Sequence, residues 1–429
     1  MPDASLAART SDLAVGASRV LALPTPVRDV VSFRGSFPTG PDLGAADDVP
    51  QGLVADLLDK GTTLRDRFEI AAALEGRGAR LSFYSDGLRM GFVGRALRDD
   101  LAPVLAITAE QLRVPAFDPD EVGKAVTKAV ASVRRSLDAT GARASGALRR
   151  RLYPAAHPNY ALDPHAEIDL LEAATADDLR AYYDAHVADP ALTLAVVGDV
   201  DADGVAAAVR DAFGDRAAPA RHPAYAAQAA PEAPGRETVP LRDRPNLDVR
   251  LGHAVALRRD ADDFLAAYAA VFALGGNFSG HLMQTIRDEQ GLTYGIGARI
   301  VDPAVEHDAH VQVAVTLSAP DLDRGIEATR AEVARFVADG LTQEALDRTQ
   351  TTLAGQHVVG LGTTGGLAAR LLVNAERGFA TAYLDAYPER IAALRLDDVN
   401  RALRRHVRPD DLHVVAAGTP PDALADGDA

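Results

Sequence analysis

The chain repeats itself at an offset of 220 residues. The segment that starts at Asp177 reads DDLRAYYDAHVADPALTLAVVGD, and the segment that starts at Asp397 reads DDVNRALRRHVRPDDLHVVAAGT. The two align without a gap, so that Gly198 falls opposite Gly418. Each predicts a capped amphipathic helix, a short connector and an apolar strand that ends at glycine. Two copies of one fold within the chain are the simplest explanation.

Earlier parts of the two halves correspond more loosely. Strand-like runs at residues 29–37 and 248–257 each precede a helical pattern, which is followed by a second helix closed by glycine and then a strand. The stretch between the halves is rich in alanine and proline, a composition typical of an exposed linker. We therefore predict an α+β fold with two homologous domains at 1–216 and 240–429, joined by a linker at 217–239. Each domain is expected to be an antiparallel-rich sheet covered by helices and built of repeated α/β modules.

Composition excludes several classes of protein. The chain has 45 Lys+Arg against 61 Asp+Glu, a formal net charge of −16, which argues against a nucleic-acid partner. It has no cysteine, which excludes disulfides, thiolate metal sites and thiol nucleophiles. No apolar run approaches the ~20 residues that span a bilayer. The start, MPDASLAARTSDLAV, shows no signal peptide, so we expect a cytoplasmic protein without a membrane partner.

The second half carries two polar side chains where the first half has leucines. Aligning Gly78 with Gly291 shows that these side chains belong to Arg287 and Tyr294. A glycine after a helix favours a left-handed C-cap, which turns the chain sharply into the next strand. We therefore expect Arg287 in the last helical turn and Tyr294 early in the strand, with both side chains directed towards one spot.

A guanidinium and a phenol offer hydrogen-bond donors but no strong nucleophile. The pair suits holding a carbonyl or stabilising an oxyanion, and it predicts catalytic roles for Arg287 and Tyr294. The alternative is structural: Arg287 caps helix carbonyls or pairs with a neighbouring carboxylate, and Tyr294 packs in the sheet.

A glycine-rich run, LGGNFSG at 274–280, leads into the helix that carries Arg287. It lacks the lysine of a P-loop and does not fit the dinucleotide-binding pattern. We expect a tight connection or a flexible loop that contacts peptide. Its candidate substrate-binding residues are Gly275, Gly276, Asn277 and Phe278. A second glycine-rich run at 360–366 predicts a connector between helices.

No metal site is predicted in this chain. The first of the 11 histidines is His157. The closest pair, His307 and His310, precedes the alternating run VQVAVTL, which indicates a polar loop at the start of a strand. We expect no metal ligand and no cofactor among this chain's own residues.

Three segments carry a resemblance to the pitrilysin/insulinase metallopeptidases, particularly the half-size, processing-peptidase type. They are GLVADLLDKGTT at 52–63, residues 173–201, and residues 274–295, of which the last is the most specific. The resemblance covers nearly the whole chain and implies the clamshell-half fold of that family. It also implies peptide substrates, whose backbone is bound by the Arg/Tyr pair of the C-terminal half.

The zinc motif of the active relatives is missing. Those relatives carry His-x-x-Glu-His shortly before a Gly-Thr pair, which here is Gly61-Thr62. The three motif positions fall on Gly52, Ala55 and Asp56. Residues 1–156 contain no histidine, and the family's third ligand, a glutamate, would lie near Ser132. Without ligands and a general base no metal-activated water can form.

The resemblance therefore implies the non-zinc-binding subunit of a two-subunit peptidase. A homologous zinc-bearing partner would supply the metal, and this chain would supply Arg287 and Tyr294. We expect it to be inactive alone, active with a His-x-x-Glu-His partner, and able to form a homodimer when no partner is present. Two alternatives stay open: a non-catalytic scaffold subunit of a larger complex, and a self-contained hydrolase of another chemistry.

Overall fold

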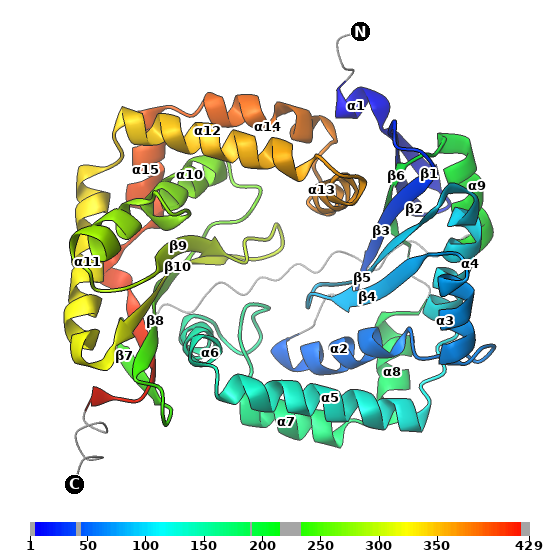
Figure 1. Ribbon diagram of the computed structural model, residues 1–429, viewed down its shortest axis with the longest axis horizontal. Coiled ribbons are helices and arrows are strands. Elements are labelled where there is room, and N and C mark those ends of the chain that lie inside the picture. Colours follow the sequence, from blue (N-terminus) through cyan, green and yellow to red (C-terminus); the bar gives the residue numbers. More distant parts are fainter. Residues whose placement is uncertain (1–4, 40–43, 189–190, 215–232, 422–429) are drawn as a thin grey trace. The chain divides into compact units, whose positions relative to one another are not determined.

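Two β-sheets, each covered by helices, form the framework of the protein (Figure 1). The computed structural model describes residues 5–39, 44–188, 191–214 and 233–421. The α+β fold predicted from the sequence is confirmed. The chain divides into two compact units, which are described separately. Unit 1 comprises Met1–Ala131, Glu167–Ala224 and Gln356–Pro388, and unit 2 comprises Ser132–Ala166, Tyr225–Gly355 and Glu389–Ala429.

The units are not the two continuous halves expected from the repeat. Residues 132–166 of the first half belong to unit 2, and residues 356–388 of the second half belong to unit 1. Most of the expected linker, 217–239, lies outside the described residues. Its last residues are not linker but part of strand β7 (Arg236–Pro240), which pairs with its neighbour along its whole length.

Unit 1 contains a six-stranded sheet. In spatial order its strands are β1 (Ser11–Val15), β2 (Ser18–Pro24), β6 (Thr193–Gly198), β3 (Val30–Pro38), β5 (Arg89–Leu97) and β4 (Arg80–Ser85). All neighbours are antiparallel except β2 and β6. Phe33 and Phe92 point to one face, where Phe92 stacks on Phe213. This aromatic cluster fixes which face of the sheet packs against helices of the first half.

The helices of unit 1 lie on both faces of its sheet. Those of the first half are α1 (Leu6–Arg9), α2 (Asp48–Leu57), α3 (Arg67–Glu75), α4 (Leu101–Arg113), α5 (Pro119–Leu137), α7 (Pro164–Ala173), α8 (Ala176–His186) and α9 (Ala202–Phe213). Helix α13 (Thr364–Glu376), from the second half, buries Ala368, Leu371 and Leu372 against β2 and β6. Helix α14 (Ala382–Ala392) follows it and extends past the end of unit 1.

Unit 2 contains a five-stranded sheet that reproduces the topology of unit 1 without its first strand. In spatial order its strands are β7, β11 (His413–Gly418), β8 (Asn246–Val255), β10 (Ala309–Ser318) and β9 (Ile296–Val301). Its helices are α6 (Thr140–Leu152), α10 (Phe264–Gly275), α11 (Leu322–Asp339), α12 (Gln343–Gly360) and α15 (Leu396–His406). Helix α6, from the first half, packs on Val415 and Ala417. Helices α10 and α11 pack on the other side of this sheet, and α15 packs on α10 (Figure 1).

Equivalent glycines end equivalent strands in the two units. Gly198 closes β6 with φ +147°, and Gly418 closes β11 with φ +152°. A Cβ on Gly198 would lie 2.1 Å from the carbonyl oxygen of Val30. Only glycine adopts this conformation at such a close approach, which explains why the repeat preserves it.

The predicted connector at 360–366 joins α12 to α13. In the part of the chain that the structure describes, no single helix is long and apolar enough to cross a membrane. Helices α12 and α13 reach that length and composition only when they are counted together across their bend.

Candidate functional site

Packing explains both glycines at the end of α10. A Cβ on Gly275 would lie 2.5 Å from the backbone nitrogen of Ala298 in β9. A Cβ on Gly276 would lie 2.5 Å from Cδ2 of Phe272, one turn earlier. These two candidate substrate-binding residues therefore let α10 end directly against the sheet, and no ligand is needed to account for them.

The segment after the glycines forms a π-helical turn over Met283–Glu289, which includes Arg287. Short π-helical segments are rare and occur frequently at functional sites. Gly291 follows with φ +64°, and Leu292 N donates a hydrogen bond to Ile286 O at 3.1 Å. The predicted left-handed glycine turn and the place of Arg287 in the last helical turn are thus both observed.

Tyr294 lies just before the strand rather than within it, because β9 begins only at Ile296. The hydroxyl of Thr293 donates to Thr316 O in β10 at 2.7 Å and accepts from Gly295 N at 3.1 Å. These bonds fix the backbone on both sides of Tyr294. Its side chain is 99% exposed, which excludes the alternative that Tyr294 packs in the sheet.

Arg287 meets Phe278 of the glycine-rich loop. The guanidinium carbon lies 4.6 Å from the ring centroid, a cation–π contact, and Nη1 donates to Asp288 Oδ1 at 3.0 Å. The ring of Phe278 is itself 68% exposed. Within the described residues no contact joins Arg287 to Tyr294. The structure therefore does not show the two side chains meeting at one spot. The pairing with Asp288 agrees with the structural alternative for Arg287, in which this side chain pairs with a neighbouring carboxylate.

Asn277 completes the loop. Its Oδ1 accepts a hydrogen bond from the Ser279 hydroxyl at 3.2 Å. The exposed surface of unit 2 thus presents a guanidinium on an aromatic ring, a carboxamide and, on the other side of the glycine turn, a free phenol. All of these are groups that hydrogen-bond or stack on a peptide, and none is a nucleophile at neutral pH.

The residues at the zinc-motif positions do not fit a zinc ion. Gly52 has no side chain, and no atom lies within 4 Å of where its Cβ would be. Ala55 is a buried apolar residue of α2. Asp56 accepts a hydrogen bond from Lys128 Nζ of α5 at 3.0 Å. Zinc needs three or four nitrogen, sulfur or carboxylate donors around one point. Within the described ranges, no three His, Asp or Glu residues are grouped so as to hold a metal.

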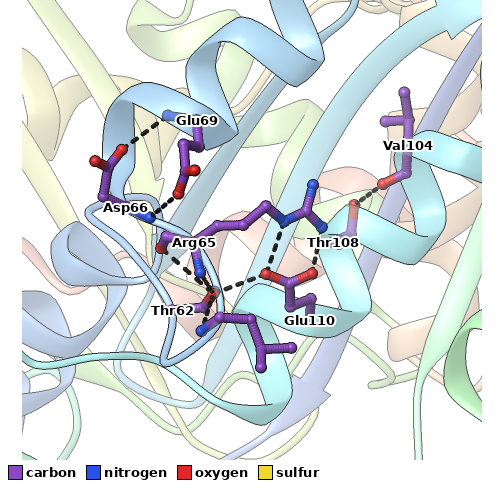
Figure 2. A network of polar contacts seen from close by, with 8 residues as sticks. Thr62, Arg65, Asp66, Glu69, Val104, Thr108 and Glu110 are labelled. Carbon is purple, nitrogen blue, oxygen red and sulfur yellow. Dashed lines mark hydrogen bonds and ion pairs between the residues drawn. The ribbon is translucent and has the colours of Figure 1, made fainter.

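The loop after α2 is tied to α4 by a polar network (Figure 2). The Thr62 hydroxyl donates to Glu110 Oε1 at 2.7 Å, and Arg65 Nε donates to the same oxygen at 3.0 Å. The hydrogen bond from Arg65 lowers the pKa of Glu110, and the same bond raises the pKa of Arg65. Asp66 and Glu69 form a capping box at the start of α3. These bonds hold the loop after α2 against α4.

A cluster of buried rings in unit 2 was not predicted from the sequence. The ring of Tyr153 stacks on His157 with centroids 4.4 Å apart, and its hydroxyl lies 3.0 Å from His310 Nδ1. Asn159 N donates to His157 Nδ1 at 2.9 Å. Burial lowers the pKa of His157 to about 4 and that of His310 to about 3. His307 lies in the loop between the antiparallel strands β9 and β10, as predicted, and His310 lies at the start of β10. Both side chains are buried, which a polar loop did not lead us to expect.

Comparison with known proteins identifies the relatives of this chain. Residues 173–353, which include the Arg287–Tyr294 segment, match the family described as the peptidase M16 inactive domain. An uncharacterized zinc protease of Streptomyces coelicolor is 25% identical over 446 residues, which cover 94% of this chain and 91% of that protein. A non-peptidase homolog of Helicobacter pylori is 24% identical over 179 residues, 41% of this chain and 40% of that protein.

A solved structure shares the fold over nearly the full length. The crystal structure of the peptidase M16 inactive domain from Pseudomonas fluorescens matches with a TM-score of 0.83 and 21% identity, covering 96% of this chain and 97% of that one. The fold, the matched family and the relatives agree with one another. The chain is therefore a homologue of the pitrilysin/insulinase (M16) peptidases.

Proposed function

We propose that this chain is the non-zinc-binding subunit of an M16-type metallopeptidase. It supplies Arg287 and Tyr294 to bind the substrate backbone and stabilise the transition state, in a heterodimer with a homologous zinc-bearing chain. The observation that carries the proposal is the free phenol of Tyr294, 99% exposed on a backbone that the Thr293 hydroxyl fixes to β10. Lys128 paired with Asp56, where relatives have a zinc motif, supports assigning the metal to the partner.

The chemistry assigned to the pair follows from their donors. A phenol O–H and a guanidinium can both donate hydrogen bonds to a peptide carbonyl as it becomes an oxyanion. Removing one such donor typically costs about 2.7–4 kcal/mol of transition-state stabilisation. The stacking of Arg287 on Phe278 holds the guanidinium in place without covering it. In this proposal the chain binds no cofactor of its own, and its ligands are peptides.

The test mixes the purified chain with an M16-type subunit that carries His-x-x-Glu-His and measures peptide cleavage. We expect no cleavage by this chain alone and cleavage by the mixture. Tyr294→Phe, which removes only the hydroxyl, should lower kcat by about 10²–10³-fold. Arg324→Ala, at an exposed arginine of α11, is the matched control and should leave the rate unchanged. Full turnover with Tyr294→Phe would show that the catalytic role is wrong.

A second candidate function is that of a non-catalytic scaffold. The similarity to a protein named a non-peptidase homolog favours it. A scaffold needs neither Arg287 nor Tyr294, so their replacement would leave its assembly intact. Stable co-purification with a large complex that lacks any chain with the zinc motif would support this function over the first.

A further inference from the structure

The segment that carries Arg287 is joined to helix α11 by a largely buried histidine. His281 lies in the helical residues just before the π-helical turn, and its Nε2 lies 3.0 Å from Oε2 of Glu332 on α11. The histidine ring also lies against Phe336, one turn further along α11, with the ring centroids 4.9 Å apart. Only 23% of the His281 side chain and 11% of the Glu332 side chain are exposed. This contact between the two helical segments is therefore directional and largely shielded from solvent.

The chemistry of the pair makes this a strong hydrogen bond. Burial lowers the pKa of His281 below its ordinary value, so the imidazole is neutral at neutral pH. Since an ionised carboxylate only accepts hydrogen bonds, the proton of the neutral ring lies on Nε2, which donates it to Glu332. The carboxylate accepts a second hydrogen bond from Arg335 Nη2 at 2.6 Å, which holds it in place. Hydrogen bonds to an ionised group are roughly twice as strong as those between neutral groups.

The backbone of His281 is in turn bonded to the π-helical segment. Its carbonyl oxygen accepts a hydrogen bond from the Thr285 hydroxyl at 3.0 Å. The carbonyl oxygen of Thr285 accepts a hydrogen bond from Gln290 N at 3.2 Å, the five-residue spacing of a π-helix. Arg287 lies between the two residues that this last bond joins. A chain of hydrogen bonds thus leads from α11 through His281 and Thr285 to the turn that carries Arg287.

A π-helical turn needs such an anchor, because the α-helix is the far commoner conformation. The apolar residues of the segment, Leu282, Met283 and Ile286, are buried. Burial of apolar surface is non-directional, so it does not by itself fix how the segment is rotated about its axis. The hydrogen bond of His281 has a defined direction. It therefore favours the arrangement in which the guanidinium of Arg287 lies on the ring of Phe278.

We infer that His281 is a positioning residue for Arg287. Through its hydrogen bond to Glu332 it holds the π-helical segment on α11, so that the guanidinium stays where a substrate carbonyl can reach it. Within the described residues no contact joins the side chains of His281 and Arg287, so His281 acts through the backbone. The inference rests on the function proposed above for Arg287. Its effect on catalysis follows because a misplacement of about 1 Å can cost about 10²-fold in rate.

Hydrogen exchange of the full chain alone tests whether His281 holds the segment. His281→Phe removes the donor but keeps a ring that can lie against Phe336. The amides of residues 290–292, whose acceptors lie in the segment, should then exchange about 10–100-fold faster, while those of β8 stay unchanged. His281→Gln, which can still donate to Glu332, should keep most of the protection. His165→Phe, at an exposed histidine of unit 2, is the control and should change nothing. Unchanged exchange at residues 290–292 in His281→Phe, or an equal increase in β8, would overturn the inference.

Peptide cleavage by the mixture with a zinc-bearing subunit tests the link to Arg287. His281→Phe should lower kcat/KM by about 10–100-fold, and His281→Gln should retain most of the activity. In the Arg287→Ala background, His281→Phe should have less than about a twofold further effect, because the side chain that it positions is gone. Equal effects with and without Arg287 would overturn the positioning role. Full turnover by Arg287→Ala, or no cleavage by the unsubstituted mixture, would instead contradict the proposed function. Exchange at residues 290–292 would still decide whether His281 holds the segment.

Discussion

One pair of residues in unit 1 has a locally unfavourable arrangement. Arg80 and Arg95 lie directly opposite each other on β4 and β5, and like charges in this position destabilise a sheet. In unit 2 the hydroxyl of Tyr294 has no partner among the described residues, whereas Arg287 pairs with Asp288 and lies on the exposed ring of Phe278. Exposed donors of this kind contribute little to the stability of the chain and stay available for hydrogen bonds to a ligand.

The repulsion between Arg80 and Arg95 predicts how a substitution at Arg95 changes the stability of the chain. Arg95→Glu replaces repulsion with an opposite-charge pair to Arg80, so it should increase the free energy of unfolding by about 0.2–1 kcal/mol. Urea denaturation of the full chain measures this change. The control, Arg28→Glu, makes the same change of charge at an exposed residue between β2 and β3, outside the sheet's register, and should have little effect. A loss of stability in Arg95→Glu would mean that an unrecognised contact of Arg95 matters more than the repulsion.

At the scale of elements, glycines set how helices meet strands. Gly275 ends α10 against β9, and Gly291 turns the chain from the π-helical segment towards the same strand. Both lie beside the residues proposed to contact peptide. The position of Arg287 and Tyr294 therefore depends on backbone geometry that only glycine permits at these points.

Gly275→Ala should destabilise unit 2 by about 1–3 kcal/mol, because its Cβ would lie 2.5 Å from Ala298 N and would displace β9 from α10. Gly355→Ala is the matched control within the same unit. Its Cβ would meet no atom within 4 Å, and alanine favours a helix, so this change should stabilise by about 0.5–1 kcal/mol. Thermal unfolding of both variants tests these two predictions. Equal stability of Gly275→Ala and the parent chain would show that the junction tolerates a side chain.

At the scale of the whole molecule, the repeat predicted the two sheets but not the exchange of helices between them. The aligned segments at Asp177 and Asp397 became α8 with β6 and α15 with β11, each pair ended by a glycine. Helices α6 and α13 pack on the sheet of the other half. Their sequences show that one face is apolar, but an apolar stripe does not specify which sheet will cover it.

The candidate sites, too, could be predicted from the sequence only in part. The placement of Arg287 and Tyr294 on either side of a glycine turn could be predicted because the turn is local and Gly291 marks it. The contact of Arg287 with Phe278 depends on how a loop folds back, which no spacing indicates. The buried cluster joins Tyr153 to His310 across 157 residues, and the pocket at β3, β4 and β5 of unit 1 is also lined by the start of α13 from the second half. Such sites become visible only in the folded chain.

Buried neutral histidines predict how stability responds to pH. Burial lowers the pKa of His157 to about 4, of His253 to about 4 and of His310 to about 3. In the unfolded chain a histidine titrates near ~6.5. Above that pH the histidines are neutral in both states. As the pH falls below it, these histidines bind protons in the unfolded state but stay neutral in the folded state. The free energy of unfolding therefore declines between about pH 6.5 and the folded pKa values.

Unit 2 should therefore lose stability at a higher pH than unit 1, since the three histidines with the largest decreases in pKa all belong to unit 2. In unit 1, burial also lowers the pKa of His357, but by less. The pKa of Glu110 in unit 1 is lowered by Arg65, so its stabilising contribution persists until the pH falls below its ordinary value of about 4.5. Hydrogen exchange, corrected for intrinsic rates, should show β8 and β10 losing protection at pH 5 relative to pH 7.5 while β3 and β5 keep theirs. His310→Gln should reduce this pH dependence because one titrating group is removed, whereas His165→Gln, at an exposed histidine of unit 2, should not. Simultaneous loss of protection in both sheets, unchanged by His310→Gln, would show that the buried histidines do not govern the response.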